Sequence, residues 1–266
     1  MSREYSYKSI CAKVRHKWKL FHFLKVQKKR FEPILLNTLP KSGSLYLLTF
    51  ITKGLLIHAT RVSTSFPLSV IDAGRMQNFL RGQYVAQGHI DAMDKNFRII
   101  DSALDKMWLH VRDPRQALIS MVHHTDRTYK NLDAVQKAVS IPGYYEIDEW
   151  YSLSFEDKVN FLIDGYYMDC VRFISGWLDY EKKFKRTKML ITQHEDLKQS
   201  EADLVSRVLN FYEIPCSIFE TVQLKRNMST HYRKGETNEW ASVMTVEQKQ
   251  RVSDALPQSL KDRFKW

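Results

Sequence analysis

Residues 33–58 read PILLNTLPKSGSLYLLTFITKGLLIH, and this order of residue types predicts a strand, a tight turn and a helix. Residues 33–39 form a short apolar run with the length of a buried strand. Residues 40–43 contain a proline and a glycine, which mark a turn. Apolar residues then recur at helical spacing from Ser44 to about His58, so a helix follows the turn directly.

The turn itself, Lys41-Ser42-Gly43-Ser44, has the chemistry of a phosphate-binding site. The N–H groups at the start of a helix lack intrahelical partners, and the helix dipole favours an anion there. Gly43 lets the backbone come close to a ligand, Lys41 adds a positive charge and Ser44 adds a hydroxyl. The turn is not a Walker A loop, because that motif needs G-x-x-x-x-G-K-[ST]. An ordinary nucleoside triphosphatase is therefore disfavoured.

The rest of the chain alternates between short strands and helices. Strands are predicted at 107–111 and 188–192, whereas residues 61–90 are mixed and rich in turn residues. Helices are predicted at 93–106, 114–124, 155–184, 200–212, 217–225 and 245–264. This order predicts an α/β fold with three layers, α/β/α, around a central parallel sheet. No linker rich in Pro, Gly or Ser divides the chain, so residues 32–266 are expected to form a single domain.

The positive charge of the chain is concentrated at its N-terminus. The formal net charge is +11, and residues 1–31 hold ten Lys or Arg and one Glu. The rest of the chain has 31 basic and 29 acidic residues, so no nucleic-acid partner is expected from overall charge. Residues 1–31 are predicted to be a basic arm or helix. It either binds a membrane surface or an anionic partner, or packs on the domain with a solvated basic face.

The cysteines and the apolar runs indicate a cytoplasmic protein. Cys11, Cys170 and Cys216 are far apart and have no metal-binding spacing, which is typical of a reducing compartment. No apolar run approaches the roughly 20 residues of a membrane helix. The N-terminus lacks the apolar segment of a signal peptide, so no transmembrane or secreted form is expected.

Residues 38–46, TLPKSGSLY, resemble the 5′-phosphosulfate loop of the sulfotransferases that use 3′-phosphoadenosine-5′-phosphosulfate (PAPS). The pattern of that family, which includes cytosolic and bacterial small-molecule enzymes, is close to T-x-P-K-S-G-T-T-W. The resemblance implies a P-loop-like fold, with a lysine that stabilises charge on the leaving phosphosulfate oxygen. It implies six donor-binding positions in this turn: Lys41, Ser42, Gly43, Ser44, Leu45 and Tyr46. Leu45 replaces a family threonine, which removes one hydroxyl contact, and Tyr46 stands at the aromatic position beside adenine.

A second motif begins at the end of the predicted strand 107–111. Residues 108–115, WLHVRDPR, with a serine eight residues after the arginine, resemble the family stretch V-R-[DN]-P-x-D-x-x-x-S. The resemblance implies that Arg112 and Ser120 bind the 3′-phosphate of the donor. A guanidinium at a strand end has the right geometry for a phosphate. The alternative for Arg112 is a local salt bridge to Asp113.

The third motif lies near the C-terminus. Residues 233–240, RKGETNEW, resemble the family element R-K-G-x-x-G-D-W, which covers the 3′-phosphate and adenine. This implies further donor contacts from Arg233, Lys234 and Gly235. A solvated basic loop is the alternative for this segment taken alone.

The family places a catalytic base on a short segment before the second motif, often in K-T-H. Here that place is taken by Gln87-Gly88-His89, so His89 is the predicted general base. A neutral histidine can take a proton from an acceptor hydroxyl or amine near pH 7. By analogy with phosphoryl transfer, the acceptor would attack sulfur in line while Lys41 stabilises the leaving group. A sulfuryl group carries one negative charge, so no metal requirement is expected.

Three weaker features concern adenine, the acceptor and the oligomer. His194 precedes Glu195-Asp196 and so stands at the aromatic position of the family element Y-E-D, which this segment resembles. The resemblance implies that His194 lies near adenine. Residues 144–150, YYEIDEW, combine carboxylates and aromatics, so the small-molecule acceptor is hypothesised to be cationic. A solvated turn with a buried tryptophan is the alternative for this segment. The charged ends of a family dimer motif around Thr245-Val246 are missing, which predicts a monomer or a weak dimer.

Two other functions stay open at this point. One is a nucleotide kinase or other phosphotransferase on a related fold, which would want a Walker lysine and acidic Mg²⁺ ligands. The other is an adenine-nucleotide or RNA-binding module driven by the basic arm, which would bind in a salt-sensitive way.

Overall fold

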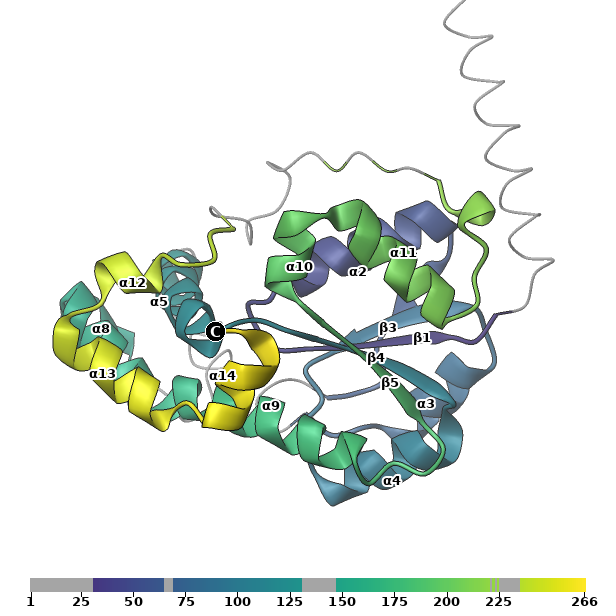
Figure 1. Cartoon of the computed structure of the whole chain (residues 1–266), viewed down its shortest axis with the longest axis horizontal. Helices are drawn as coiled ribbons and strands as arrows, with labels where there is room; N and C mark the ends of the chain where they lie inside the picture. The colour runs from purple at the N-terminus through teal and green to yellow at the C-terminus, as the bar shows by residue number, and fades with distance from the viewer. Residues whose placement is uncertain (1–30, 65–68, 131–146, 221, 223, 225–234) are drawn as a thin grey trace, which may run out of the picture.

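The structure is a computed structural model of the chain, and it describes residues 31–64, 69–130, 147–220, 222, 224 and 235–266. Within these residues five parallel strands form one sheet in the order β2-β3-β1-β4-β5 (Figure 1). The strands are β1 Ile34–Thr38, β2 His58–Thr60, β3 Tyr84–Gly88, β4 Lys106–Val111 and β5 Lys188–Gln193. β1 pairs with β3 on one side and with β4 on the other. Because all neighbours are parallel, the C-terminal ends of the strands meet at one edge of the sheet.

Helices cover both faces of the sheet, so the predicted three layers are confirmed. Figure 1 shows α2, α10 and α11 on one face and α3, α4 and α9 on the other. α5, α8, α12 and α13 lie together beyond one end of the sheet. The helices are α2 Ser44–Leu55, α3 Ala73–Leu80, α4 Asp94–Ala103, α5 Pro114–Lys130, α7 Ile147–Ser152, α8 Phe155–Leu162, α9 Met168–Glu181, α10 His194–Gln199, α11 Glu201–Phe211, α12 Trp240–Val243, α13 Val246–Ala255 and α14 Gln258–Phe264. A π-helical turn, η1 Ile163–Tyr167, joins α8 to α9, and η2 Cys216–Ile218 is a 3₁₀ turn.

The central strand β1 holds the two apolar cores together. Side chains along a strand point to alternate faces. Ile34 and Leu36 accordingly pack in the cluster that includes α2 and α11, and Leu35 packs in the cluster on the opposite face. Every residue of β1 is buried, as expected for a strand of a parallel sheet covered on both faces.

Most predicted elements are confirmed, and two regions differ. β2, α3 and β3 lie within residues 61–90 or at their edge, where the sequence was interpreted as mixed and turn-rich. The helix predicted at 217–225 is wrong, because the described residues form only the 3₁₀ turn η2 and then extended backbone. The physical reason is packing on α2. The Glu220 N–H donates to the Gly54 carbonyl at 2.8 Å, and the Phe219 ring contacts Phe50 with ring centroids 5.5 Å apart.

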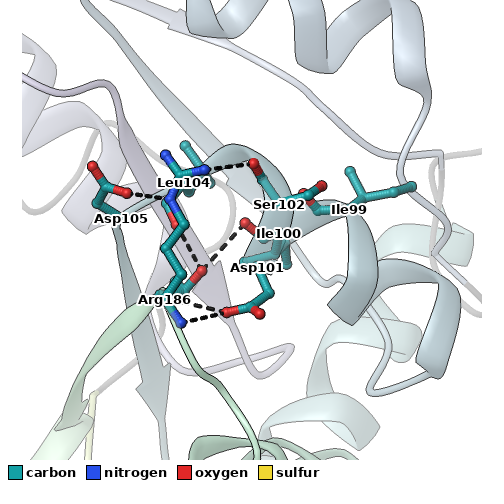
Figure 2. Close-up of polar contacts among 8 residues, drawn as sticks. Ile99, Ile100, Asp101, Ser102, Leu104, Asp105 and Arg186 are labelled. Atoms are coloured by element: carbon teal, nitrogen blue, oxygen red, sulfur yellow. Dashed lines mark hydrogen bonds and ion pairs between the residues drawn. The ribbon is translucent and has the colours of Figure 1, made fainter.

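The start of β5 is fixed to the end of α4 by a cluster of polar contacts (Figure 2). The backbone N–H groups of Arg186 and Thr187 both donate to Asp101 Oδ1 at 3.0 Å. The Thr187 hydroxyl donates to the Leu104 carbonyl at 2.7 Å, and the Arg186 guanidinium pairs with Asp105. These bonds hold the pKa of the Asp101 carboxyl below its usual range, with the Thr187 N–H as the main cause. The cluster sets where β5 begins, and so it sets which residues emerge at the other end of β5.

Candidate active site

The turn after β1 combines two residues in the left-handed backbone region. Lys41 has φ 67° and Gly43 has φ 95°. A side chain at position 43 would be strained by this φ, and its Cβ would lie 3.4 Å from His194 Nδ1. The Ser42 side chain is fully buried, and its hydroxyl donates to the Leu39 carbonyl at 2.7 Å. The Ser42 hydroxyl is therefore already engaged within the turn.

Helix α2 begins with a first turn suited to an anion. Its N-cap residue is Gly43, which has no side chain to cap the free N–H groups, and the first turn holds no acidic residue. Leu45 is 40% exposed in this turn, where the family pattern has a hydroxyl. The backbone N–H groups and the dipole of α2 thus remain as the anion-binding groups.

Tyr46 has a firm position on the α2 side of the site. Its hydroxyl donates to the Glu201 carboxylate of α11, and its ring stacks on Phe50 with centroids 6.0 Å apart. The predicted contact of Tyr46 with adenine stays a prediction.

His89 lies directly beside this turn. Its Nδ1 is 2.7 Å from the Thr38 carbonyl and 3.1 Å from the Thr38 hydroxyl. A carbonyl can only accept, so Nδ1 must carry the hydrogen, and the lone pair of the neutral ring is at Nε2. Burial lowers the pKa of His89, and the positive charges of Lys41 and Arg61 lower it further. The imidazole is therefore neutral near pH 7, with Nε2 able to accept a proton.

Gln87 takes a structural part in place of the family lysine. Its amide nitrogen donates to the Thr38 hydroxyl at 3.0 Å and to the Gly88 carbonyl at 3.2 Å. Gln87 thus supports the same Thr38 that holds His89, without adding a positive charge.

Arg112 joins the turn to the C-terminal segment. Its Nη1 donates to the Lys41 carbonyl at 2.8 Å, and its Nη2 donates to the Glu236 carbonyl. The side chain is 5% exposed, and its Nε has no hydrogen-bond partner among the described residues. The alternative salt bridge to Asp113 is not what forms, because the Asp113 carboxylate is taken by Arg115, with the closest atoms 2.7 Å apart. Arg112 therefore bonds to the backbone of the turn and of the C-terminal segment, and not to Asp113.

The structure describes two of the four other residues that are predicted to bind the 3′-phosphate. Ser120 lies half-buried on α5, the helix that begins two residues after Arg112. Gly235 adopts φ 63° and starts the segment whose next carbonyl, that of Glu236, accepts from Arg112. Arg233 and Lys234 lie outside the described residues.

The segment 235–240 is held against the second motif. The Arg115 guanidinium lies 4.1 Å from the centroid of the Trp240 ring, and the Gln116 side chain accepts from the Trp240 N–H at 3.2 Å. A cavity of about 420 Å³ opens beside this segment, lined by Lys198, Gly235, Glu236, Thr237, Asn238, Glu239 and Ser242. The two motifs, more than 100 residues apart in the sequence, are therefore neighbours in space.

The comparison with known families agrees with this geometry. The sequence matches the family described as sulfotransferase domain over residues 31–264. The chain belongs to the sulfotransferase family. No curated protein sequence matches this sulfotransferase.

Solved structures similar to this sulfotransferase have low sequence identity to it. The mouse sulfotransferase SULT7A1, complexed with PAP, is 17% identical, with a TM-score of 0.55 over 85% of this chain and 83% of that chain. A sulfotransferase from Alicyclobacillus acidocaldarius is 12% identical, with a TM-score of 0.48 over 86% of this chain and 96% of that chain. The sulfotransferase domain from the curacin biosynthetic pathway is 11% identical, with a TM-score of 0.48 over 85% of this chain and 98% of that one.

The side-chain amine of Lys41 in this sulfotransferase has a pKa far below that of an ordinary lysine. Burial, aided by repulsion from Arg127 and Arg112, lowers the pKa of its amine to about 7. An anionic ligand at the turn would favour the charged form and raise that pKa. The protonation of Lys41 is thus coupled to the occupancy of the turn.

A group of buried polar residues behind the turn was not predicted from the sequence. His110 and Thr192 are buried at the ends of β4 and β5, and the Glu195 carboxylate is buried close to Arg112. Burial raises the pKa of Glu195 to about 7. The one available signal was a histidine in the otherwise apolar strand 107–111, which the motif match to Arg112 overshadowed.

No set of three or more His, Cys, Asp and Glu side chains in the described part of the chain is arranged to hold a metal ion. None of the helices described is long and apolar enough to cross a bilayer.

Proposed function

We propose that this sulfotransferase moves a sulfuryl group from PAPS to a hydroxyl or amine of a small-molecule acceptor. The observation that carries the proposal is the meeting of three predicted residues at one turn. His89 bonds to the Thr38 carbonyl before the turn, Arg112 bonds to the Lys41 carbonyl within it, and the half-buried Lys41 amine lies close enough to Arg112 for their charges to repel. PAP, 3′-phosphoadenosine-5′-phosphate, is what remains of PAPS after the sulfuryl group has left. Its presence in the similar mouse structure supports PAPS as the donor.

The donor would lie along the C-terminal edge of the sheet. Its 5′-phosphosulfate would accept from the N–H groups at the start of α2 and from Lys41. Its 3′-phosphate would be met by Arg112, Ser120, Arg233, Lys234 and Gly235. Tyr46 and His194 are the candidates for the adenine side. The short, charge-assisted bonds of a guanidinium to a phosphate make Arg112 the main determinant of 3′-phosphate recognition.

The transfer step follows from where the proton and the charge go. The acceptor oxygen or nitrogen attacks sulfur, and the bond between sulfur and the bridging phosphate oxygen breaks. The acceptor proton goes to His89 Nε2, and the electron pair of the broken bond stays on the phosphate of PAP. Lys41 and the N–H groups of the turn stabilise that charge. We therefore predict that the transfer needs no metal ion.

The proposal is tested by calorimetric titration with PAP, AMP and ATP, with and without Mg²⁺. PAP is expected to bind at least about 100-fold more tightly than AMP and independently of Mg²⁺, because only PAP offers the 3′-phosphate. Equal binding of ATP, or Mg²⁺-dependent binding, would instead support the phosphotransferase alternative. Absence of PAP binding would refute the proposed donor.

A cationic acceptor is the finer part of the proposal. It is supported by the carboxylates and aromatics of residues 144–150, a segment that begins outside the described residues. Sulfation of a panel of primary amines, quaternary ammonium alcohols and neutral phenols and alcohols from radiolabelled PAPS tests it. Sulfation of the neutral compounds alone would reject the cationic acceptor and leave the sulfotransferase proposal intact.

Donor binding is expected to take up a proton at Lys41. With a pKa of about 7, the amine is mostly neutral at pH 8.5 in the free protein, whereas the bound anion holds it protonated. The protonated form binds better, so PAP affinity should fall as pH rises above 7, by up to about tenfold per pH unit. Calorimetry at pH 8.5 in two buffers of different ionisation enthalpy measures the uptake, which should approach one proton per site.

The Lys41→Met variant is the control for this linkage. It removes the titrating amine and retains an unbranched side chain at the same position. Its PAP binding should be weaker and should lose the proton uptake. Equal uptake by the wild type and Lys41→Met would place the proton elsewhere and contradict the prediction.

A further inference from the structure

The carbonyl of Ser42 accepts hydrogen bonds from two imidazoles. His194 Nδ1 lies 2.9 Å from this oxygen and His110 Nε2 lies 3.2 Å from it. A carbonyl oxygen has two lone pairs, so it can accept both. His110 is fully buried and His194 is 6% exposed, and they come from β4 and from the start of α10. The central turn of the site is thus held from behind by two side chains that the transfer step does not use.

The network behind His110 fixes which of its nitrogens carries the hydrogen. The Trp108 indole N–H donates to the Thr192 hydroxyl oxygen at 2.7 Å. The Thr192 hydroxyl oxygen is also 2.7 Å from His110 Nδ1. Since the Ser42 carbonyl can only accept, His110 Nε2 must carry the hydrogen, and the Thr192 hydroxyl, which accepts from the indole, donates its own hydrogen to His110 Nδ1. The hydrogen of the neutral His110 ring is then on Nε2, which is the nitrogen that faces Ser42.

His194 reaches the same result from its other nitrogen. Its Nδ1 faces the Ser42 carbonyl and must carry the hydrogen. Burial, aided by the positive charge of the nearby Arg112, lowers the pKa of both His110 and His194 to about 3. Both rings are therefore neutral in the working pH range, and each has one N–H committed to Ser42.

The Ser42–Gly43 peptide needs such a restraint. In a trans peptide the C=O of one residue and the N–H of the next point in opposite directions. A Ser42 carbonyl held by the two histidines therefore directs the Gly43 N–H to the other side, where α2 begins. Glycine tolerates positive and negative φ, so rotation of this peptide plane would meet little steric resistance from Gly43.

We propose that His110 and His194 are positioning residues, which orient the Ser42–Gly43 peptide so that the Gly43 N–H faces the bound donor. This rests on the proposed function for the identity of the donor. Apolar residues would fill the same buried space, and burying an imidazole is unfavourable unless it is hydrogen-bonded. The bonds to the Ser42 carbonyl offset part of this cost, while His194 Nε2 is buried with no hydrogen-bond partner among the described residues.

The test uses the fact that the two histidines donate from different nitrogens. Asparagine places its amide nitrogen near the Nδ1 position of histidine, and glutamine places it near Nε2. His194→Asn and His110→Gln should therefore keep the bond to Ser42, whereas His194→Leu and His110→Leu remove it. His194→Gln is the matched control, because it has the same chemistry as asparagine with the donor at the wrong distance.

Two readouts separate this inference from the proposed function. The first is the rate at which the Gly43 peptide exchanges between conformations in the ligand-free protein, from relaxation dispersion of the protein labelled with [¹⁵N]glycine, in which Gly43 is one of nine glycines. The second is the PAP dissociation constant from calorimetry. Both leucine variants and His194→Gln should raise the Gly43 exchange rate and the PAP dissociation constant about tenfold. His110→Gln should stay within about threefold of the wild type in both readouts, and His194→Asn should keep the wild-type Gly43 exchange rate within about threefold.

The two readouts distinguish a failure of the proposed donor from a failure of the proposed role of the histidines. No PAP binding by the wild type would refute the donor, while Gly43 exchange would still test the histidines. Unchanged exchange and affinity in the leucine variants, or equal losses in the asparagine and glutamine variants, would overturn the positioning role. Should a leucine variant not fold, Thr192→Val takes its place. It is nearly isosteric, removes the hydroxyl that bonds to His110 Nδ1, and should shift both readouts in the same direction by about fivefold, beyond the limit expected of the conserving variants.

Discussion

Replacement of Arg112 by alanine should weaken PAP binding by about 100-fold or more. A phosphate bound by a buried guanidinium makes charge-assisted bonds, each about twice as strong as a neutral one. Arg112 also donates to the carbonyls of Lys41 and Glu236, so the variant loosens the turn and the C-terminal segment as well. Calorimetric titration of wild type and variant with PAP and with AMP measures the loss.

The comparison of the two ligands separates the two parts of this effect. AMP lacks the 3′-phosphate, so its affinity should fall less than about tenfold, through the loosened turn alone. Arg112→Lys should recover part of the PAP affinity, since lysine keeps the charge but lacks the planar fork. Arg98→Ala, at an exposed position of α4, should change nothing. An equal loss for PAP and AMP would mean that Arg112 supports the turn and does not read the 3′-phosphate.

The local features of this site could be predicted because they depend on neighbouring residues. The strand, turn and helix at 33–58 follow from one apolar run, one Pro, one Gly and one helical period. Arg112 and His89, in contrast, were predicted from the resemblance of residues 108–115 and 87–89 to sulfotransferase motifs. The strands β2 and β3 were missed because β2 has only three residues, two of them exposed, and neither shows a strong apolar run.

The supporting contacts could not be predicted because they join distant parts of the chain. Ser42 and His194 are 152 residues apart in the sequence, and Tyr46 and Glu201 are 155 apart. Their partnership depends on the strand order β1-β4-β5, which brings the ends of non-consecutive strands together. A sequence pattern can mark a histidine as a candidate, but the acceptor of each ring nitrogen is set by the assembled sheet. His194 was therefore predicted as an adenine contact, whereas its bond to Ser42 could not be predicted.

Replacement of His89 by asparagine should reduce sulfuryl transfer by about 10²- to 10⁴-fold, the usual contribution of a general base. The asparagine amide nitrogen can keep the bond that Nδ1 donates to the Thr38 carbonyl, now 2.7 Å long, but no basic nitrogen remains at the Nε2 position. The fold of the segment and the donor site should therefore survive, and the PAP dissociation constant should stay within about threefold of the wild type. Transfer is measured with radiolabelled PAPS and the best acceptor of the panel.

Two further variants make this result specific to the base. His89→Ala removes the bond to Thr38 as well, and it should lose as much transfer and also some thermal stability. His58→Asn, at an exposed position of β2, should leave transfer unchanged. Retention of more than a tenth of the wild-type transfer rate by His89→Asn would show that the acceptor proton leaves by another route. The role of the segment 87–89 would then be the support of Thr38, from which the turn begins, and catalysis would rest on Lys41 and the N–H groups of α2.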